Sequence, residues 1–259
     1  MEANQYSHRY CITAADIDTR YRMTANAVLL YYQDCWARYM ACMHMAAFDL
    51  VHKGRIWVIT EFNAWWEEKD AFWSQDVEVT VWNSEMSNLR LYGDFRMTKP
   101  DGTLLSHGYG CWTMLDIEQH RPVMMTELGS EQLRIVPCNE RHRKIRIPED
   151  VEMLHEVSHR VNPINLDFNG HVNNRTYLNI AMQTISDDRI GNRRLRSLTI
   201  RWLHETFLGD TLQCRLCTTA TENAYVHTIS KEGTPVAQIY SNLTERTDHS
   251  VIDDEALRE

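Results

Sequence analysis

One order of predicted elements occurs twice along the 259-residue chain, and this repeat limits the possible folds more than any other feature. In each copy a short strand leads into a polar segment, a helix follows, and strands of alternating hydrophobicity come after it. The polar segments also align with each other, since Asp18-Thr-Arg-Tyr-Arg22 matches Asp167-Phe-Asn-Gly-His171 at the acidic residue. We therefore expect a duplicated scaffold, in which each copy packs one helix against one antiparallel sheet.

The first copy is predicted from residues 1–120. Its helix follows from an apolar stripe with helical spacing, which consists of Val28, Leu29, Tyr32, Trp36, Tyr39, Met40 and Met43. Such a stripe usually forms core, although it could also line a ligand. Strands are predicted at residues 8–17, 56–66, 76–82, 88–97 and 103–116. The segment Lys99-Pro-Asp-Gly102 between the last two has the Pro and Gly of a hairpin turn.

The second copy is predicted from residues 151–247. Its helix should run from about residue 174 to 187, and Glu232-Gly233 should form a hairpin turn. Its strands are expected at residues 156–161, 195–203, 211–219, 224–231 and 235–244. Residues 121–150 contain three prolines and dense charge, so we interpret them as a linker with a short helix near Thr126–Leu133. Residues 248–259 form an acidic tail.

Composition excludes several classes of function. The formal net charge of -9 disfavours binding to nucleic acid or to anionic membranes. No run approaches the roughly 18 apolar residues of a membrane helix, and we expect a cytoplasmic protein without a transit peptide. The seven cysteines should be reduced thiols, and Cys214-Arg-Leu-Cys217 has no second pair to complete a metal site. We predict no metal and no cofactor.

The polar segment of the second copy combines a carboxylate, an amide and an imidazole. Asp167, Asn169 and His171 stand at every second position, so in an extended segment their side chains would lie on one face. Asn173 and Asn174 are candidate caps for the helix that follows, whose free N–H groups can meet a negative charge. The first copy has Arg20 and Arg22 at the matching positions, and guanidinium groups cannot act as bases. The sequence therefore indicates one chemical site in two copies of the scaffold.

Two segments carry a resemblance to a known family. Asp167-Phe-Asn-Gly-His-Val-Asn-Asn-Arg-Thr-Tyr177 resembles the signature of the fatty acyl-ACP thioesterases, which are plant plastid enzymes and their bacterial relatives. Leu198–Leu212 is similar to the strand of that family that carries a functional glutamate, here Glu205. The resemblance implies an α+β tandem (double) hotdog, in which each half is a long helix wrapped by an antiparallel sheet. It also implies that the first half shapes the tunnel for the acyl chain.

The resemblance implies a set of site residues. The catalytic positions would be Asp167, Asn169, His171 and Glu205, and the substrate-binding positions Val172, Asn173, Asn174, Tyr177 and Thr206. Plant members usually carry Cys directly after the glutamate, where this chain has Thr206. That departure excludes a thiol nucleophile at this position and favours hydrolysis by water. Ile180 stands where plant members have Trp, which concerns packing or chain length more than chemistry.

Thioester hydrolysis needs a base for water and a donor for the carbonyl oxygen as it gains charge. Glu205 or His171 can serve as the general base, and backbone N–H groups near His171–Asn173 can hold the oxyanion. Asn169 can orient water or the carbonyl, and Asp167 can fix its neighbours through hydrogen bonds. Taken singly, these residues are more often turn, cap or surface residues. No Gly-x-Ser-x-Gly elbow and no phosphate-binding loop of the Gly-x-x-x-x-Gly-Lys type occurs in the sequence.

We therefore expect an acyl-ACP thioesterase that releases a free fatty acid, with acyl carrier protein as its partner. The alternatives are an acyl-CoA thioesterase of the same fold and a non-catalytic hotdog protein that binds acyl ligands. Two basic segments could meet an acidic carrier protein, namely residues 141–146 and the arginines at 189, 193, 194 and 196, although such charges more often belong to solvated linkers and loops. A monomer that acts as a pseudo-dimer and a homodimer are both compatible with the repeat.

Overall fold

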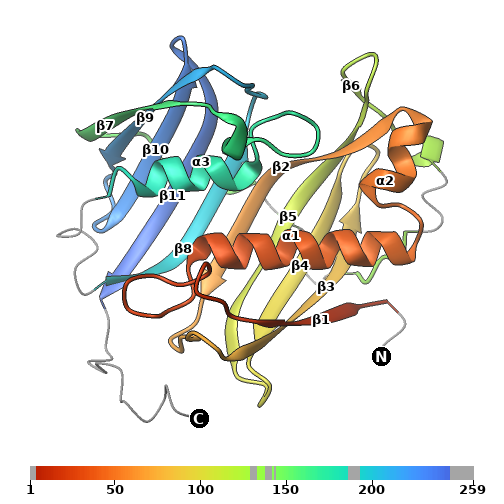
Figure 1. Ribbon diagram of the computed structural model, residues 1–259, viewed down its shortest axis with the longest axis horizontal. Coiled ribbons are helices and arrows are strands. Elements are labelled where there is room, and N and C mark those ends of the chain that lie inside the picture. The colour runs from red at the N-terminus through yellow and green to blue at the C-terminus, as the bar shows by residue number, and fades with distance from the viewer. Residues whose placement is uncertain (1–3, 129–132, 138–141, 143, 186–192, 246–259) are drawn as a thin grey trace. The chain divides into compact units, whose positions relative to one another are not determined.

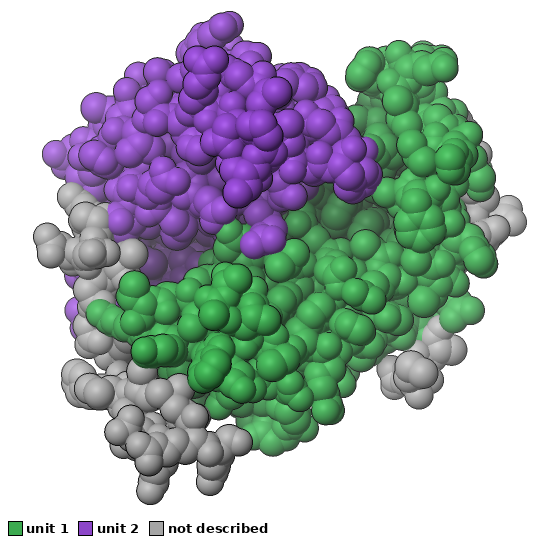
Figure 2. Space-filling model, viewed as in Figure 1, with its two compact units in different colours: residues 1–144, 254–259 green, residues 145–253 purple. Residues whose placement is uncertain are grey.

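The computed structural model describes residues 4–128, 133–137, 142, 144–185 and 193–245. These residues form two compact units, which we call unit 1 (within residues 1–144) and unit 2 (within residues 145–253) (Figure 2). The boundary falls inside the predicted linker, whose own limits of 121 and 150 stay a prediction. The predicted acidic tail lies outside the described residues. No helix in the described part of the chain is long and apolar enough to cross a membrane.

Unit 1 consists of one long helix packed against an antiparallel sheet (Figure 1). The strands follow the order β1-β3-β4-β5-β2, and β6 pairs with β5. The elements are β1 (Tyr6–Cys11), α1 (Ala25–Cys42), α2 (Ala47–Leu50), η1 (Val51–Lys53), β2 (Arg55–Trp66), β3 (Asp76–Met86), β4 (Leu91–Thr98), β5 (Leu104–Asp116), β6 (Arg121–Pro122) and η2 (Met125–Leu128). The strand–helix–strands order predicted for the first copy is thus present.

The helix α1 begins where Thr24 caps it, because the Thr24 side chain accepts a hydrogen bond from the Ala27 N–H over 3.2 Å. The predicted apolar stripe is buried, and Tyr32 lies at its centre. Its hydroxyl donates to the Gly93 carbonyl over 2.9 Å. A Cβ at Gly110 would lie 2.3 Å from that hydroxyl, so only glycine lets the sheet approach Tyr32 this closely. The stripe is therefore core, which confirms the commoner interpretation.

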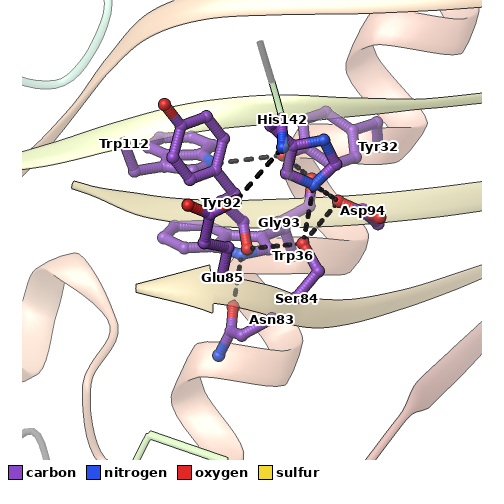
Figure 3. A network of polar contacts seen from close by, with 10 residues as sticks. All are labelled: Tyr32, Trp36, Asn83, Ser84, Glu85, Tyr92, Gly93, Asp94, Trp112 and His142. Carbon is purple, nitrogen blue, oxygen red and sulfur yellow. Dashed lines mark hydrogen bonds and ion pairs between the residues drawn. The ribbon is translucent and has the colours of Figure 1, made fainter. Parts of the chain in front are cut away.

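A polar cluster on β3 and β4 of unit 1 holds His142 (Figure 3). His142 Nε2 lies 2.8 Å from Asp94 Oδ1 and 3.0 Å from Ser84 Oγ, which donates to Asp94 Oδ1 over 2.6 Å. In a serine–histidine–aspartate relay the serine and the aspartate bond opposite ring nitrogens. Here both face Nε2, and Ser84 is buried. The cluster therefore anchors residue 142 to the sheet and lacks the geometry of a nucleophilic site.

Unit 2 repeats the arrangement with a shorter helix (Figure 1). Its strands follow the order β8-β11-β10-β9-β7, and every neighbouring pair is antiparallel. The elements are β7 (Met153–Arg160), η4 (Pro163–Asn165), α3 (Asn174–Met182), β8 (Arg193–Trp202), β9 (Thr211–Thr218), β10 (Ala224–Lys231) and β11 (Thr234–Glu245). The turn at Glu232 and Gly233 has positive φ at both residues, as a two-residue hairpin requires.

The long helix predicted in each copy is present, but the second of these helices and the short helix predicted in the linker are shorter than the sequence pattern indicates. The helix α3 ends at Met182, earlier than the predicted end at residue 187, which lies outside the described residues. The helix predicted near Thr126–Leu133 is only the 3-10 turn Met125–Leu128 in the described part of this segment. The short elements α2 and η1 were not predicted, because four or three residues are too few for a periodic pattern.

A fully buried histidine lies in the core of unit 2. His227 Nδ1 is 3.0 Å from Thr184 Oγ1, whose own proton goes to the Ala181 carbonyl over 2.6 Å. His227 therefore carries its proton on Nδ1. Its Nε2 has no hydrogen-bond partner among the described residues. Burial lowers the pKa of His227 to about 4, because the imidazolium would place a charge and an unpaired N–H in the core.

This burial predicts acid sensitivity. The unfolded-state pKa of histidine is about 6.5, above the folded value, so the unfolded state binds more protons between pH 4 and 6.5. The free energy of unfolding should be fully retained above pH 6.5 and fall by up to about 1.4 kcal/mol per pH unit as the pH drops towards 4. Urea unfolding of wild type and of His227→Phe across this range measures the slope, which should be smaller in the variant. An equal slope in both proteins would contradict the assignment, and the exposed His107→Gln serves as control.

Candidate functional site

Asp167 organises the segment that carries the candidate residues. Its carboxylate oxygen Oδ1 accepts the backbone N–H of Asn169 over 2.8 Å and that of His171 over 3.2 Å. The Gly170 N–H donates to the Asp167 carbonyl over 3.1 Å, and Gly170 has a φ of 78°. The prediction of an extended segment with three side chains on one face is therefore wrong. An Asp two residues before Asn-Gly folds the chain into a turn, because its carboxylate accepts the N–H groups two and four residues on.

The same turn occurs in unit 1. Asp18 Oδ1 accepts the N–H of Arg20 over 2.8 Å and that of Arg22 over 3.0 Å. The Asp18 N–H donates to the Arg22 carbonyl over 2.8 Å, as the Asp167 N–H does to the His171 carbonyl. Tyr21 has a φ of 61° at the position of Gly170. The two polar segments that align in sequence therefore form the same turn with corresponding hydrogen bonds.

The structure brings His171 and Glu205 together. His171 Nδ1 lies 3.5 Å from Glu205 Oε1, and the two side chains are 32% and 39% exposed. The His171 ring meets the Phe207 ring edge-on, with centroids 5.1 Å apart. An imidazole beside a carboxylate at this distance, open to solvent, can exchange a proton with water. The Asn169 side chain has no hydrogen bond with either residue in the described part of the chain.

Unit 1 carries different side chains at the positions of this pair. Arg22 occupies the place of His171 in the turn, and its Nε lies 3.4 Å from Asp18 Oδ2. The Met23 N–H donates to the Ala71 carbonyl over 2.9 Å, as the Val172 N–H does to the Thr206 carbonyl. Asp70, which precedes Ala71, therefore stands where Glu205 stands in unit 2. Since a guanidinium remains charged at every working pH, this copy has no imidazole–carboxylate pair.

The backbone N–H groups expected to hold an oxyanion are already bonded. The N–H groups of residues 171, 172 and 173 donate to Asp167 Oδ1, to the Thr206 carbonyl and to the Asn165 carbonyl. The prediction that they hold the oxyanion is therefore wrong, because the turn and the helix start use them. The Arg175 N–H donates to Asn173 Oδ1 over 3.0 Å, which confirms Asn173 as the helix cap.

The expected substrate-binding residues lie at the start of α3 and beside Glu205. Tyr177 and Thr206 are buried, and their hydroxyl oxygens are 2.6 Å apart. Val172 is also buried, and the Asn174 carbonyl accepts from Trp202 Nε1 over 3.3 Å. Contact of any of these residues with substrate stays a prediction.

Sequence reasoning missed Asn165 as part of the site. Its side-chain oxygen accepts the Asn162 N–H over 3.0 Å and lies 3.1 Å from His159 Nε2. Its carbonyl accepts the Asn173 N–H over 2.8 Å, so Asn165 links the segment before the turn to the cap of α3. The signal was present in the repeat, because Asp16 accepts the Thr13 N–H in the same way. Asp16 and Asn165 stand two residues before Asp18 and Asp167, at matching positions of the repeat.

The cysteines of the described residues are unpaired thiols. Burial raises the pKa of Cys214 to about 12 and also raises that of Cys217, so neither is a thiolate near neutral pH. In the described part of the chain no cluster of three or more His, Cys, Asp or Glu side chains could hold a metal ion.

Comparison with known protein families decides the assignment. Residues 3–131 match the acyl-ACP thioesterase N-terminal domain, and residues 148–245 match the acyl-ACP thioesterase C-terminal domain. The chain belongs to the acyl-ACP thioesterase family. It is thus an enzyme that hydrolyses acyl-ACP thioesters. No curated protein matches the chain significantly by sequence.

Three solved structures share the fold over nearly their whole length. An acyl-ACP thioesterase from Bacteroides thetaiotaomicron is 16% identical, with a TM-score of 0.81 over 93% of this chain and 98% of that one. A putative oleoyl thioesterase from Lactobacillus plantarum is 18% identical, with a TM-score of 0.84 over 95% and 98%. The 12:0-ACP thioesterase from Umbellularia californica is 15% identical, with a TM-score of 0.84 over 95% and 99%. The predicted α+β tandem hotdog is confirmed.

The geometry of the Asp167 turn predicts how two substitutions differ. Both hydrogen bonds go to one oxygen, which the amide oxygen of Asp167→Asn can replace, so this variant should keep turnover within about threefold. Asp167→Ala removes the acceptor, and it should lower the free energy of unfolding by about 1 kcal/mol and turnover by more than about tenfold. Steady-state hydrolysis and urea unfolding measure both effects.

The matched control is Asp18→Ala, which removes the same turn acceptor from unit 1. It should lower stability by a similar amount and leave turnover unchanged. If Asp167→Asn were as inactive as Asp167→Ala, the negative charge of Asp167 would matter and the purely structural role would be wrong.

Proposed function

We propose that this thioesterase hydrolyses its substrate with a water molecule activated by Glu205 and His171. The observation that carries the proposal is the 3.5 Å separation of His171 Nδ1 and Glu205 Oε1, in a pair open to solvent. Glu205 is assigned as the general base, and His171 orients it and shares the proton. The absence of such a pair at Arg22 and Asp70 supports a single site in the C-terminal half.

The remaining steps follow from the chemistry of a thioester. Water attacks the carbonyl carbon, its proton passes to Glu205, and the carbonyl oxygen gains charge. The Asn169 amide is the proposed donor to that oxygen, since the neighbouring backbone N–H groups are occupied. The carbon–sulfur bond then breaks, and the carrier leaves as a thiolate, which is a stable enough anion to need no strong acid. Thr206 cannot replace water as nucleophile, because its hydroxyl is buried and bound to Tyr177.

We further propose that the N-terminal hotdog, residues 1–120, shapes the tunnel for the acyl chain, and that the enzyme works in the cytoplasm as a monomer or homodimer. The repeat supports this division of labour, since unit 1 keeps the scaffold of unit 2 without its imidazole–carboxylate pair. Acyl carrier protein is the partner that the family assignment implies.

Removal of either member of the pair should abolish most of the activity. Glu205→Gln and His171→Ala should each lower kcat by more than about tenfold, since general-base help contributes roughly 10²–10⁴-fold. Both side chains are a third exposed, so the unfolding midpoint should hardly change. Asp70→Asn in unit 1 is the matched control and should keep wild-type turnover. Full activity of Glu205→Gln would overturn the assignment of the base.

Selectivity for the protein carrier should depend on charge. An acyl carrier protein is acidic, so reversing the basic residues of segment 141–146 or of 189–196 should weaken hydrolysis of acyl-ACP more than that of acyl-CoA. Added salt should have the same selective effect, because it screens exposed charges. Part of each segment lies outside the described residues. Equal turnover of both thioesters, insensitive to charge reversal, would favour the acyl-CoA alternative.

A further inference from the structure

A buried pair of hydroxyl groups lies directly behind the candidate pair. Tyr177 Oη and Thr206 Oγ1 are 2.6 Å apart, with Tyr177 2% exposed and Thr206 0% exposed. Burial raises the pKa of Tyr177 to about 12, so its hydroxyl keeps its proton near neutral pH and can donate it. Tyr177 belongs to α3, while Thr206 follows Glu205 in the loop between β8 and β9. The bond therefore joins the helix to the loop that carries Glu205.

Two backbone contacts run alongside this bond. The Val172 N–H donates to the Thr206 carbonyl over 2.9 Å, and His171 and Phe207 form an isolated antiparallel bridge. Each contact links the segment that carries His171 to the segment that carries Glu205. The Tyr177–Thr206 bond consists of side chains alone, so substitution can remove it and leave the backbone contacts in place.

Unit 1 shows that the scaffold does not need the hydroxyl pair. Val28 lies four residues after the cap Thr24, as Tyr177 lies four residues after the cap Asn173. Ala71 takes the place of Thr206, and both Val28 and Ala71 are buried. The backbone bond from Met23 to Ala71 keeps the length of 2.9 Å without any hydroxyl group. The hydroxyl pair thus accompanies the copy that has His171 and Glu205 and is missing from the copy that has Arg22 and Asp70.

We propose that Tyr177 and Thr206 are positioning residues, whose hydrogen bond fixes the Glu205 loop against α3 and so holds the Glu205 carboxylate at its distance from His171. This inference rests on the proposed function of that pair. Glu205 lies on an exposed loop, and a carboxylate there has many orientations unless its backbone is fixed. A displacement of about 1 Å at a reacting group can lower a rate about 10²-fold. The role differs from the substrate contact that the sequence suggested for both residues.

The test is a double-mutant cycle on turnover. Tyr177→Phe and Thr206→Val each remove one hydroxyl with little change in shape, and each should lower kcat by about tenfold or more while KM changes less than about threefold. The double variant should be no slower than the slower single variant, because both substitutions remove one bond. Thr206→Ser keeps a hydroxyl and should restore most of the kcat lost in Thr206→Val.

Tyr31→Phe is the matched control. Tyr31 is a buried tyrosine of α1 whose hydroxyl donates to Asp16 Oδ2 over 2.8 Å. Loss of this hydroxyl should lower the unfolding midpoint about as much as Tyr177→Phe does and leave kcat unchanged. A kcat within twofold of wild type for Tyr177→Phe and Thr206→Val would overturn the proposal. A rise in KM at constant kcat would also overturn it, in favour of substrate contact.

Glu205→Gln, measured beside these variants, separates a failure of the positioning role from a failure of the proposed function. If Glu205→Gln is inactive while the hydroxyl variants are fully active, only the positioning role fails. If Glu205→Gln itself is active, the proposed function of the pair fails with it.

Discussion

One carboxylate that accepts two backbone N–H groups determines the geometry of the candidate site. Asp167 holds the N–H groups of Asn169 and His171, and this capture turns the chain sharply just before α3. The turn sets where the residues that follow it lie. His171 leaves it beside the Glu205 loop, and Val172 continues from it into the bond with Thr206. The cap Asn173 then starts the helix. A carboxylate is the strongest acceptor available for this purpose, and its bonds are charge-assisted.

The same turn in unit 1 separates scaffold from chemistry. Asp18 makes the same two bonds, yet the side chain that leaves the turn is Arg22, and the loop beside it carries Asp70 and Ala71. The turn therefore forms whether its last residue is an arginine or a histidine. Catalytic ability depends on a few side chains added to one copy, namely His171, Glu205 and, by our inference, the hydroxyl pair behind them. Unit 1 is then free of the constraints of catalysis, which fits the proposed role in holding the acyl chain.

The sequence predicts the parts of the fold that depend on local periodicity. The stripe on α1 and the alternating strands are regular enough to place most of the sheet within a few residues. The sequence also supplies the repeat, the four catalytic candidates and the family. The local sequence pattern gives the wrong prediction at the polar segment. The alternation of Asp167, Asn169 and His171 suggests an extended chain, but Asp167 and Gly170 form a turn. It also fails for contacts between distant residues. Tyr177 and Thr206 lie in different elements, and only the fold shows that their hydroxyl groups meet.

The two copies share a scaffold and differ in chemistry, and one variant tests this difference. The double variant His171→Arg with Glu205→Asp replaces the candidate pair of unit 2 with the residue types that unit 1 has at the matching positions, Arg22 and Asp70. Hydrolysis of an acyl carrier protein thioester and thermal unfolding are measured on the same preparation. We expect an unfolding midpoint within about 4 °C of wild type and a kcat lowered by about 10²-fold or more. A variant that keeps its turnover, or that fails to fold, would contradict it.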